Sequence, residues 1–249
     1  MFVRPSNPIS HRLARMAFIL ACVGALIVAA SGPLHRFLEL DIEAAIAVFR
    51  YGFYVAAAGA TLGLATILPT RPGDRRRGFV AAFLGIVIGV AASWVPLRWF
   101  LQAQTLPAIN DITTDLGSPP PLVATLPLRR GASNPPAYPA ASAPLQKAAF
   151  PDIEALVLPV PPDEAFRRAD QVAAAMGWNV VARAPAEGRL EAVATSQWFG
   201  FRDDIVVRIR PQGTGCRVDI RSKSRIGEAD LGGNVERVRT FLARLKAEG

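Results

Sequence analysis

Three long runs without a charged side chain constrain this chain more than any other feature of its sequence. They are Met16–Leu34, Tyr51–Thr70 and Gly78–Leu97, and they contain 19, 20 and 20 residues. A helix rises about 1.5 Å per residue, so roughly 20 residues cross the ~30 Å hydrocarbon core of a bilayer. Each run therefore predicts a membrane-spanning helix, and residues 1–100 are expected to form a three-helix transmembrane module.

Arginines are concentrated at alternate ends of these runs. Arg4, Arg12 and Arg15 precede the first run, and the link 71–77 carries four arginines against one aspartate. The link 35–50 instead holds two arginines against three acidic residues. Because basic short loops stay on the cytoplasmic side, we expect a cytoplasmic N-terminus and an outward-facing chain after about residue 98.

The first uncharged run has an alternative interpretation. The first run could be a cleaved signal peptide, since Val28, Ala29 and Ala30 precede Ser31. The two remaining spans would still leave the C-terminal part outside.

Small residues four positions apart let helix backbones approach closely, either between copies in an oligomer or within one bundle. The glycines with this spacing are Gly59/Gly63 and Gly85/Gly89.

Composition excludes several classes of site. The formal charge is +8, but residues 98–249 hold 19 Lys or Arg against 16 acidic residues. Most of the excess positive charge therefore lies in residues 1–97, where it reflects the orientation of the spans in the membrane. No nucleic-acid partner is expected. Both histidines, His11 and His35, precede the C-terminal part, and the two cysteines are Cys22 and Cys216. We therefore expect no metal site, no cofactor and no catalytic nucleophile with a histidine base.

The outward part of the chain divides into two segments. Residues 116–150 contain eight prolines, so 101–151 is either a free linker or a Pro-rich extended strap on the following domain, and we favour the strap. Residues 152–249 are expected to form an α+β domain. Its class is a two-layer antiparallel sheet with helices on one face. The expected elements are a short strand within 153–159, a helix from Pro161 to Gly177, strands at 178–183, 189–196, 203–210 and 215–223, and a helix from Asp230 to Lys246.

Two of the strands alternate between apolar and charged residues. Ile205, Val207 and Ile209 point one way, and the opposite face is basic. Guanidinium groups match carboxylates and phosphates, so this face could bind an anion. The alternative is a solvated face with cross-strand ion pairs. Its charged residues are Arg208, Arg210, Arg217, Arg221 and Lys223, with Asp204 and Asp219.

An aromatic cluster stands between two of these strands. Trp198, Phe199 and Phe201 surround Gly200. They could form a tip that contacts membrane or ligand, or they could close one end of the domain core, and we favour the second interpretation.

The blocks TSQWFGFRDDIVVRIRP (195–211) and CRVDIRSKSRIGEADLGGNVERVRTFLARL (216–245) resemble a bacterial family known as domain of unknown function fourteen ninety-nine. PAINDITTD (107–115) and LQKAAFPDIEAL (145–156) resemble its upstream blocks. The resemblance implies that the Pro-rich strap belongs to the domain and that forms with several N-terminal spans are ordinary. It implies no activity. The positions that match the motif are Trp198, Arg221, Ser222, Arg225 and Asp230.

We therefore expect a protein of the bacterial cytoplasmic (inner) membrane with a periplasmic domain that binds an anionic ligand or partner. Expected partners are the lipid bilayer and an anionic lipid, a polysaccharide or another envelope protein. Two alternatives are a hydrolase or transferase that uses Asp111, Asp115 and arginine, and an assembly scaffold whose spans do the work. The expected binding residues are Arg208, Arg210, Arg221, Arg225, Trp198 and Asp230.

Overall fold

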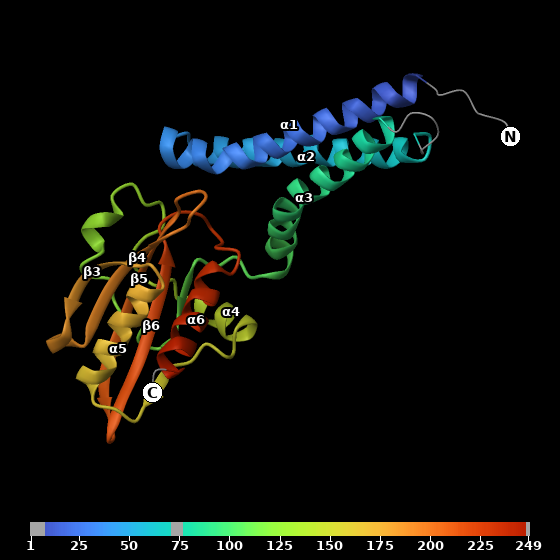
Figure 1. The fold of residues 1–249 in the computed structure, drawn as a ribbon. Helices are drawn as coiled ribbons and strands as arrows, with labels where there is room; N and C mark the ends of the chain where they lie inside the picture. The colour runs from blue at the N-terminus through green and yellow to red at the C-terminus, as the bar shows by residue number, and fades with distance from the viewer. Residues whose placement is uncertain (1–7, 71–76, 248–249) are drawn as a thin grey trace. The chain divides into compact units, whose positions relative to one another are not determined.

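The computed structural model describes residues 8–70 and 77–247, and the chain divides into two compact units (Figure 1). One unit comprises Met1–Leu101 together with Gln197–Gly200. The other comprises Gln102–Ser196 and Phe201–Gly249. Arg4 and the basic residues of 71–76, on which the predicted orientation depends, lie outside the described residues.

Within the described residues, the first unit contains three helices that are long and apolar enough to cross a membrane. They are α1 (Pro8–Leu38), α2 (Ile42–Ile67) and α3 (Arg77–Thr105), and α3 runs on into the second unit. The predicted link 35–50 is mostly helical. Asp41 caps α2 by accepting a hydrogen bond from the Glu43 amide at 2.9 Å, so α2 begins nine residues before the uncharged run that starts at Tyr51.

The paired glycines lie against neighbouring helices of the same chain. A Cβ atom on Gly59 would lie 2.5 Å from the Ala21 nitrogen, and one on Gly89 would lie 2.6 Å from the Ala56 oxygen. Gly63 and Gly85 face α3 and α1 at similarly short range. These glycines therefore permit close packing inside the bundle. Oligomerisation through them stays a prediction.

A sheet of six strands, counted over the described residues, forms the second unit. Every pairing is antiparallel, in the order β1-β6-β5-β4-β3, and β2 also pairs with β6. The four strands predicted after residue 177 and the short strand within 153–159 are present. The strand β1 was not predicted, because three residues are too few for a recognisable alternation. The bounds are β1 (Asp111–Thr113), β2 (Leu156–Leu158), β3 (Asn179–Ala184), β4 (Arg189–Thr195), β5 (Arg202–Gln212) and β6 (Gly215–Ser224).

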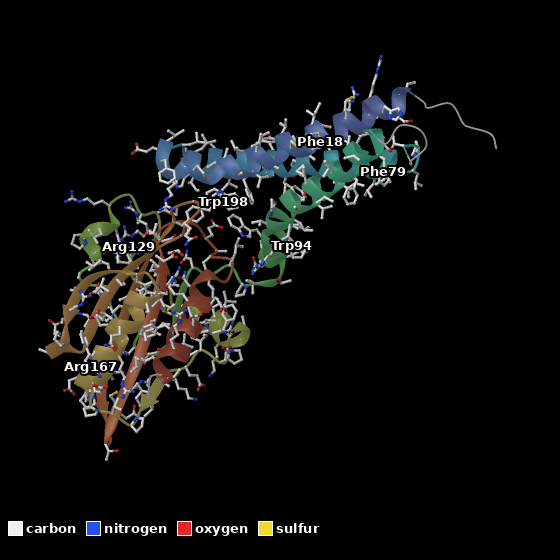
Figure 2. All side chains as sticks on the ribbon, in the orientation of Figure 1. Phe18, Phe79, Trp94, Arg129, Arg167 and Trp198 are labelled. Atoms are coloured by element: carbon white, nitrogen blue, oxygen red, sulfur yellow. The ribbon has the colours of Figure 1, made fainter. Side chains whose placement is uncertain are left out.

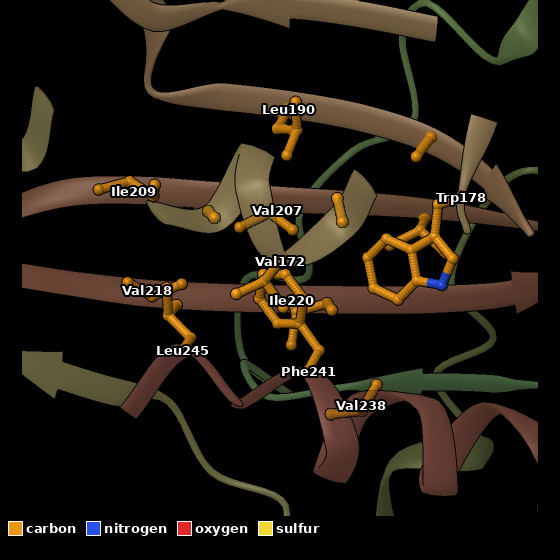
Figure 3. Packing of buried hydrophobic residues seen from close by; sticks show 14 of the residues in the cluster. Val172, Trp178, Leu190, Val207, Ile209, Val218, Ile220, Val238, Phe241 and Leu245 are labelled. Atoms are coloured by element: carbon orange, nitrogen blue, oxygen red, sulfur yellow. The ribbon is translucent and has the colours of Figure 1, made fainter. Parts of the chain in front are cut away.

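Helices α5 (Pro162–Ala175) and α6 (Gly233–Ala247) cover one face of this sheet, as predicted (Figure 1). Figure 3 shows strand residues such as Val207 and Ile220 packed against residues of both helices. The rings of Trp178 and Phe241 are stacked, with their centroids 5.3 Å apart. Helix α4 (Ser142–Ala149) was not predicted, because prolines dominate its surroundings. Pro144 lies in the first turn of α4, where no backbone N–H is needed. The short 3-10 helices are η1 (Leu126–Arg129) and η2 (Pro185–Glu187).

The opposite face of the sheet is covered by residues 114–141, here called the cover segment. Glu191 of β4 accepts hydrogen bonds from backbone amides of the cover segment, with the Ala124 nitrogen at 2.9 Å. Arg221 of β6 donates to the Pro136 oxygen at 2.8 Å, and Arg225 donates to the Leu128 oxygen at 2.7 Å. The Pro-rich segment therefore lies on the sheet and is not a free linker.

Candidate functional site

Most of the predicted basic face of the sheet is covered, and among its described side chains only those of Arg210 and Arg217 are more than about one third exposed. Strand alternation shows which side chains share a face, but it contains no information about a segment that lies over that face. The alternative of a solvated face was therefore wrong for its buried part, although the cross-strand ion pairs of that alternative are present. The buried charged residues, each at most 8% exposed, are Asp111, Arg129, Glu191, Asp204, Asp219, Arg221, Lys223 and Arg225.

Asp111 anchors the first cluster of buried charges. Its Oδ1 and Oδ2 accept from Arg221 Nε at 2.9 Å and Nη2 at 2.8 Å, and Oδ2 also accepts from Lys223 Nζ at 2.8 Å. Arg221 donates as well to the carbonyl oxygens of Pro120 and Pro136. A proline-rich extended segment leaves its carbonyls unpaired, so these oxygens are available to a guanidinium group.

Asp204 anchors the second cluster. Arg225 donates to its carboxylate from Nη2 at 2.7 Å and from Nε at 3.1 Å, and Arg129 of the cover segment pairs with the same group. Arg129 also donates to the Asn134 oxygen at 2.7 Å. Figure 2 places Arg129 beside one end of the sheet, and these contacts fasten the cover segment there.

The two clusters together carry an excess of positive charge. Among the described side chains in them, four cations, including Lys223, face the two carboxylates of Asp111 and Asp204. Burial lowers the pKa of Lys223, and its contact with Asp111 offsets this only in part. The three guanidinium groups alone outnumber the two carboxylates. The buried clusters are therefore electropositive even when Lys223 is neutral.

A third cluster, here called the arginine corner, consists of Arg208, Arg210 and Arg217. These side chains surround Asp219, with Nη2 to carboxylate oxygen distances of 3.0 Å each, and Asp115 lies within 3.7 Å of all three. The side chains of Arg210 and Arg217 are 46% and 35% exposed. Burial raises the pKa of Asp219, but the hydrogen bonds from Arg217 and Arg208 outweigh it, so the pKa is lowered overall.

Glu191 holds the cover segment to the middle of the sheet. Its carboxylate is fully buried and accepts from the amides of Val123, Ala124 and Thr125 at 2.9–3.2 Å and from the Thr125 hydroxyl at 2.9 Å. Arg189 pairs with the same carboxylate. Burial raises the pKa of Glu191, but these backbone hydrogen bonds lower it further, so the net direction is downward.

The lowered pKa values of Glu191 and Asp219 predict acid sensitivity. A carboxyl whose pKa is lower in the folded state stabilises the fold above its unfolded pKa and loses this contribution as the pH falls through its folded pKa. Asp230, whose pKa burial raises, acts in the opposite sense. We expect the free energy of unfolding of the sheet domain to fall below about pH 5. Urea unfolding followed by circular dichroism between pH 7 and pH 3 measures this. An unchanged free energy would contradict it, and Glu191→Gln is expected to flatten the slope.

The six predicted binding residues do not form one site. Arg208 and Arg210 lie together at the arginine corner, whereas Arg221 and Arg225 lie in the two buried clusters.

The other two predicted binding residues, Asp230 and Trp198, lie elsewhere. Asp230 caps α6, since its carboxylate accepts hydrogen bonds from the Gly232 amide at 3.0 Å and from the Asn234 amide. Trp198 belongs to Gln197–Gly200, which groups with the helical unit. The core cluster of the sheet domain contains neither Trp198 nor Phe199, so the expectation that these rings close that core was wrong.

Two important residues were not singled out from the sequence. Glu191 is the only carboxylate within β4, so its alternation could have placed it on the polar face. No sequence signal connects Arg129 with Asp204, because the pair joins residues 75 positions apart. The carboxylates of the alternative enzyme site are also separated. Asp111 pairs with Arg221 and Lys223, and Asp115 pairs at the arginine corner.

A hollow of about 330 Å³, here called the proline hollow, opens between parts of the cover segment. Arg221 lies in its wall, with its guanidinium carbon 5.7 Å from the centre of the Tyr138 ring. Burial is the main cause that raises the pKa of Tyr138 to about 12. Among the described residues, no group of three His, Cys, Asp or Glu side chains is placed to hold a metal ion. The hollow is lined by Pro119, Pro121, Leu122, Leu126, Pro136, Ala137, Tyr138 and Arg221.

Comparison with known proteins identifies one family. The family model described as "Protein of unknown function (DUF1499)" matches residues 111–245, which include the whole cover segment and the sheet. The search of curated proteins found no match. Among solved structures, the crystal structure of TTHA0849 from Thermus thermophilus is similar, with 18% identity and a TM-score of 0.25. The similarity covers 38% of this chain and 96% of that chain, and at this TM-score it supports no conclusion about fold or function.

Proposed function

The chain belongs to the DUF1499 family, and on that premise we propose that it is an inner-membrane protein that presents its sheet domain in the periplasm to bind an anionic envelope ligand or partner. Three helices long enough to span a membrane support the anchoring. An odd number of spans carries the C-terminal domain to the side opposite the N-terminus. The N-terminal segment and the 71–77 link are rich in arginine, which favours the cytoplasmic side for both of them.

The single observation that carries the binding proposal is the exposure of Arg210 and Arg217. These two arginines lie directly opposite each other on β5 and β6, and their side chains are 46% and 35% exposed. Asp219, between them, is fully buried and is shared with Arg208. The arginine corner therefore presents two guanidinium edges that carboxylate pairing does not exhaust, and such edges recognise carboxylate, sulfate or phosphate.

The arginine corner can be tested on the full chain in phosphatidylcholine nanodiscs, with dextran sulfate as a polyanionic probe and neutral dextran as a blank. Replacing Arg210 and Arg217 together by alanine is expected to weaken dextran sulfate binding roughly two- to thirtyfold, since exposed pairs contribute about 0.2–1 kcal/mol each.

The matched control is Arg244→Ala with Lys246→Ala, which removes the same charge from exposed positions on α6. Its binding is expected to stay within about twofold of the parent, as is usual for surface substitutions away from a site. Equal losses in the two double variants would mean that only net charge matters, and this would overturn the proposed binding surface. Circular dichroism checks that both variants are folded.

A further inference from the structure

We propose that the proline hollow binds a small anion that carries a short apolar chain, such as a medium-chain carboxylate. The inference rests on the proposed function, which is anion binding by the sheet domain. It adds a class of ligand and a second binding site besides the arginine corner. The wall of the hollow is almost entirely apolar, and Arg221 is its one charged residue. A ligand that fits this wall therefore needs an apolar body and one negatively charged group.

Arg221 has donor capacity left for such a ligand. A guanidinium group has five N–H donors. Four of these reach oxygens of Asp111, Pro120 and Pro136. The remaining donor is on Nη1, and it has no partner among the described residues. Because Arg221 is 2% exposed and lines the hollow, a carboxylate there would receive a desolvated, charge-assisted hydrogen bond.

The surroundings of Arg221 favour an anion and disfavour a neutral or cationic guest. Asp111 is shared between Arg221 and Lys223, and the neighbouring Asp204 is shared between Arg129 and Arg225. An added negative charge would bring the number of anions closer to the number of buried cations. It would also reduce the repulsion that a buried excess of positive charge imposes.

The size of the hollow limits the ligand. About 330 Å³ lies at the lower end of the range for ligand pockets, roughly 300–1,000 Å³. A carboxylate with five or six carbons fits such a space, whereas a two-chain phospholipid does not. The Tyr138 ring and the prolines supply a rigid apolar wall that loses little conformational entropy when a chain packs on it.

The test uses the full chain in phosphatidylcholine nanodiscs and equilibrium dialysis of labelled hexanoate, with empty nanodiscs subtracted. Saturable binding of hexanoate is expected. Hexan-1-ol and hexyltrimethylammonium are expected to bind at least about tenfold more weakly, since a hydrogen bond to a charged group is lost. Equal binding of hexanol, or no saturable binding of hexanoate, would overturn the proposal.

Two variants at exposed positions of the hollow avoid the buried clusters, so they are not expected to unfold the domain. Leu126→Asp adds a like charge at the rim, and Ala137→Trp fills the space. Both are expected to weaken hexanoate binding about tenfold or more. Leu128→Asp is the matched control, because Leu128 is as exposed as Leu126 but does not line the hollow. An equal effect in the control would refute the assigned place.

Dextran sulfate binding, measured on the same samples, separates this inference from the proposed function. Dextran sulfate is too large for the hollow. If it binds at the arginine corner while hexanoate does not bind, the inference about the hollow fails alone. If neither probe binds, anion binding by the domain fails as well.

Discussion

Replacing Asp204 by alanine is expected to lower the free energy of unfolding of the sheet domain by roughly 3–5 kcal/mol. Asp204 is fully buried, and its carboxylate pairs with both Arg129 and Arg225. Without it, both guanidinium groups would remain buried without their carboxylate. Domains are stable by only about 5–15 kcal/mol, so this loss is a large share of the total. Hydrogen exchange of β5 and β6 amides in the full chain, read by mass spectrometry, measures it.

Glu154→Ala is the matched control for this variant, since it also removes one carboxylate but from an exposed position. We expect its free energy of unfolding to change by about 0.5 kcal/mol or less. A loss below about 1 kcal/mol for Asp204→Ala would contradict the claim that the buried pairs of the sheet face depend on this carboxylate.

Replacing Glu191 by alanine is expected to release the middle of the cover segment from the sheet. Three backbone amides and the Thr125 hydroxyl would lose their acceptor, and Arg189 would lose a buried partner. An unsatisfied buried donor costs about 1–3 kcal/mol, so the amides of residues 123–125 should exchange roughly a hundredfold faster through local opening. Hydrogen exchange of peptides from residues 119–130 reports this directly.

Glu187→Ala provides the comparison, because Glu187 also pairs with Arg189 but its side chain is 64% exposed and contacts no amide of the cover segment in the described hydrogen bonds. Its exchange rates at residues 123–125 are expected to match those of the parent. Unchanged exchange in Glu191→Ala would show that the cover segment is held by other contacts.

Local sequence patterns were sufficient to predict most of the fold. Uncharged runs predicted α1 to α3, and alternation with turn residues predicted β3 to β6, because burial of a helix or strand face leaves a periodic trace. The last helix was also predicted, from Asp230 to Lys246, because an apolar helical repeat follows Asp230. Helix α6 begins three residues later, at Gly233, and Asp230 bonds the amides on either side of this start.

The candidate site could not be predicted in the same way. The alternation of β5 and β6 correctly placed Arg221 and Lys223 on the face opposite the helices, yet it could not show that carbonyls of Pro120 and Pro136 lie over Arg221. Such contacts join segments about 85 to 101 residues apart and have no period. The result is that the cover segment closes most of this face, and the exposed part of the face is reduced to the arginine corner.

The proposal of an envelope ligand depends on the sheet domain lying on the outer side of the membrane. Alkaline phosphatase fused after residue 249 tests this placement, because the enzyme is active only where its disulfides form. The account predicts an active fusion at residue 249 and an inactive fusion within the 71–77 link, at equal expression. The reverse pattern would place the domain in the cytoplasm and contradict the proposal that it binds an envelope ligand.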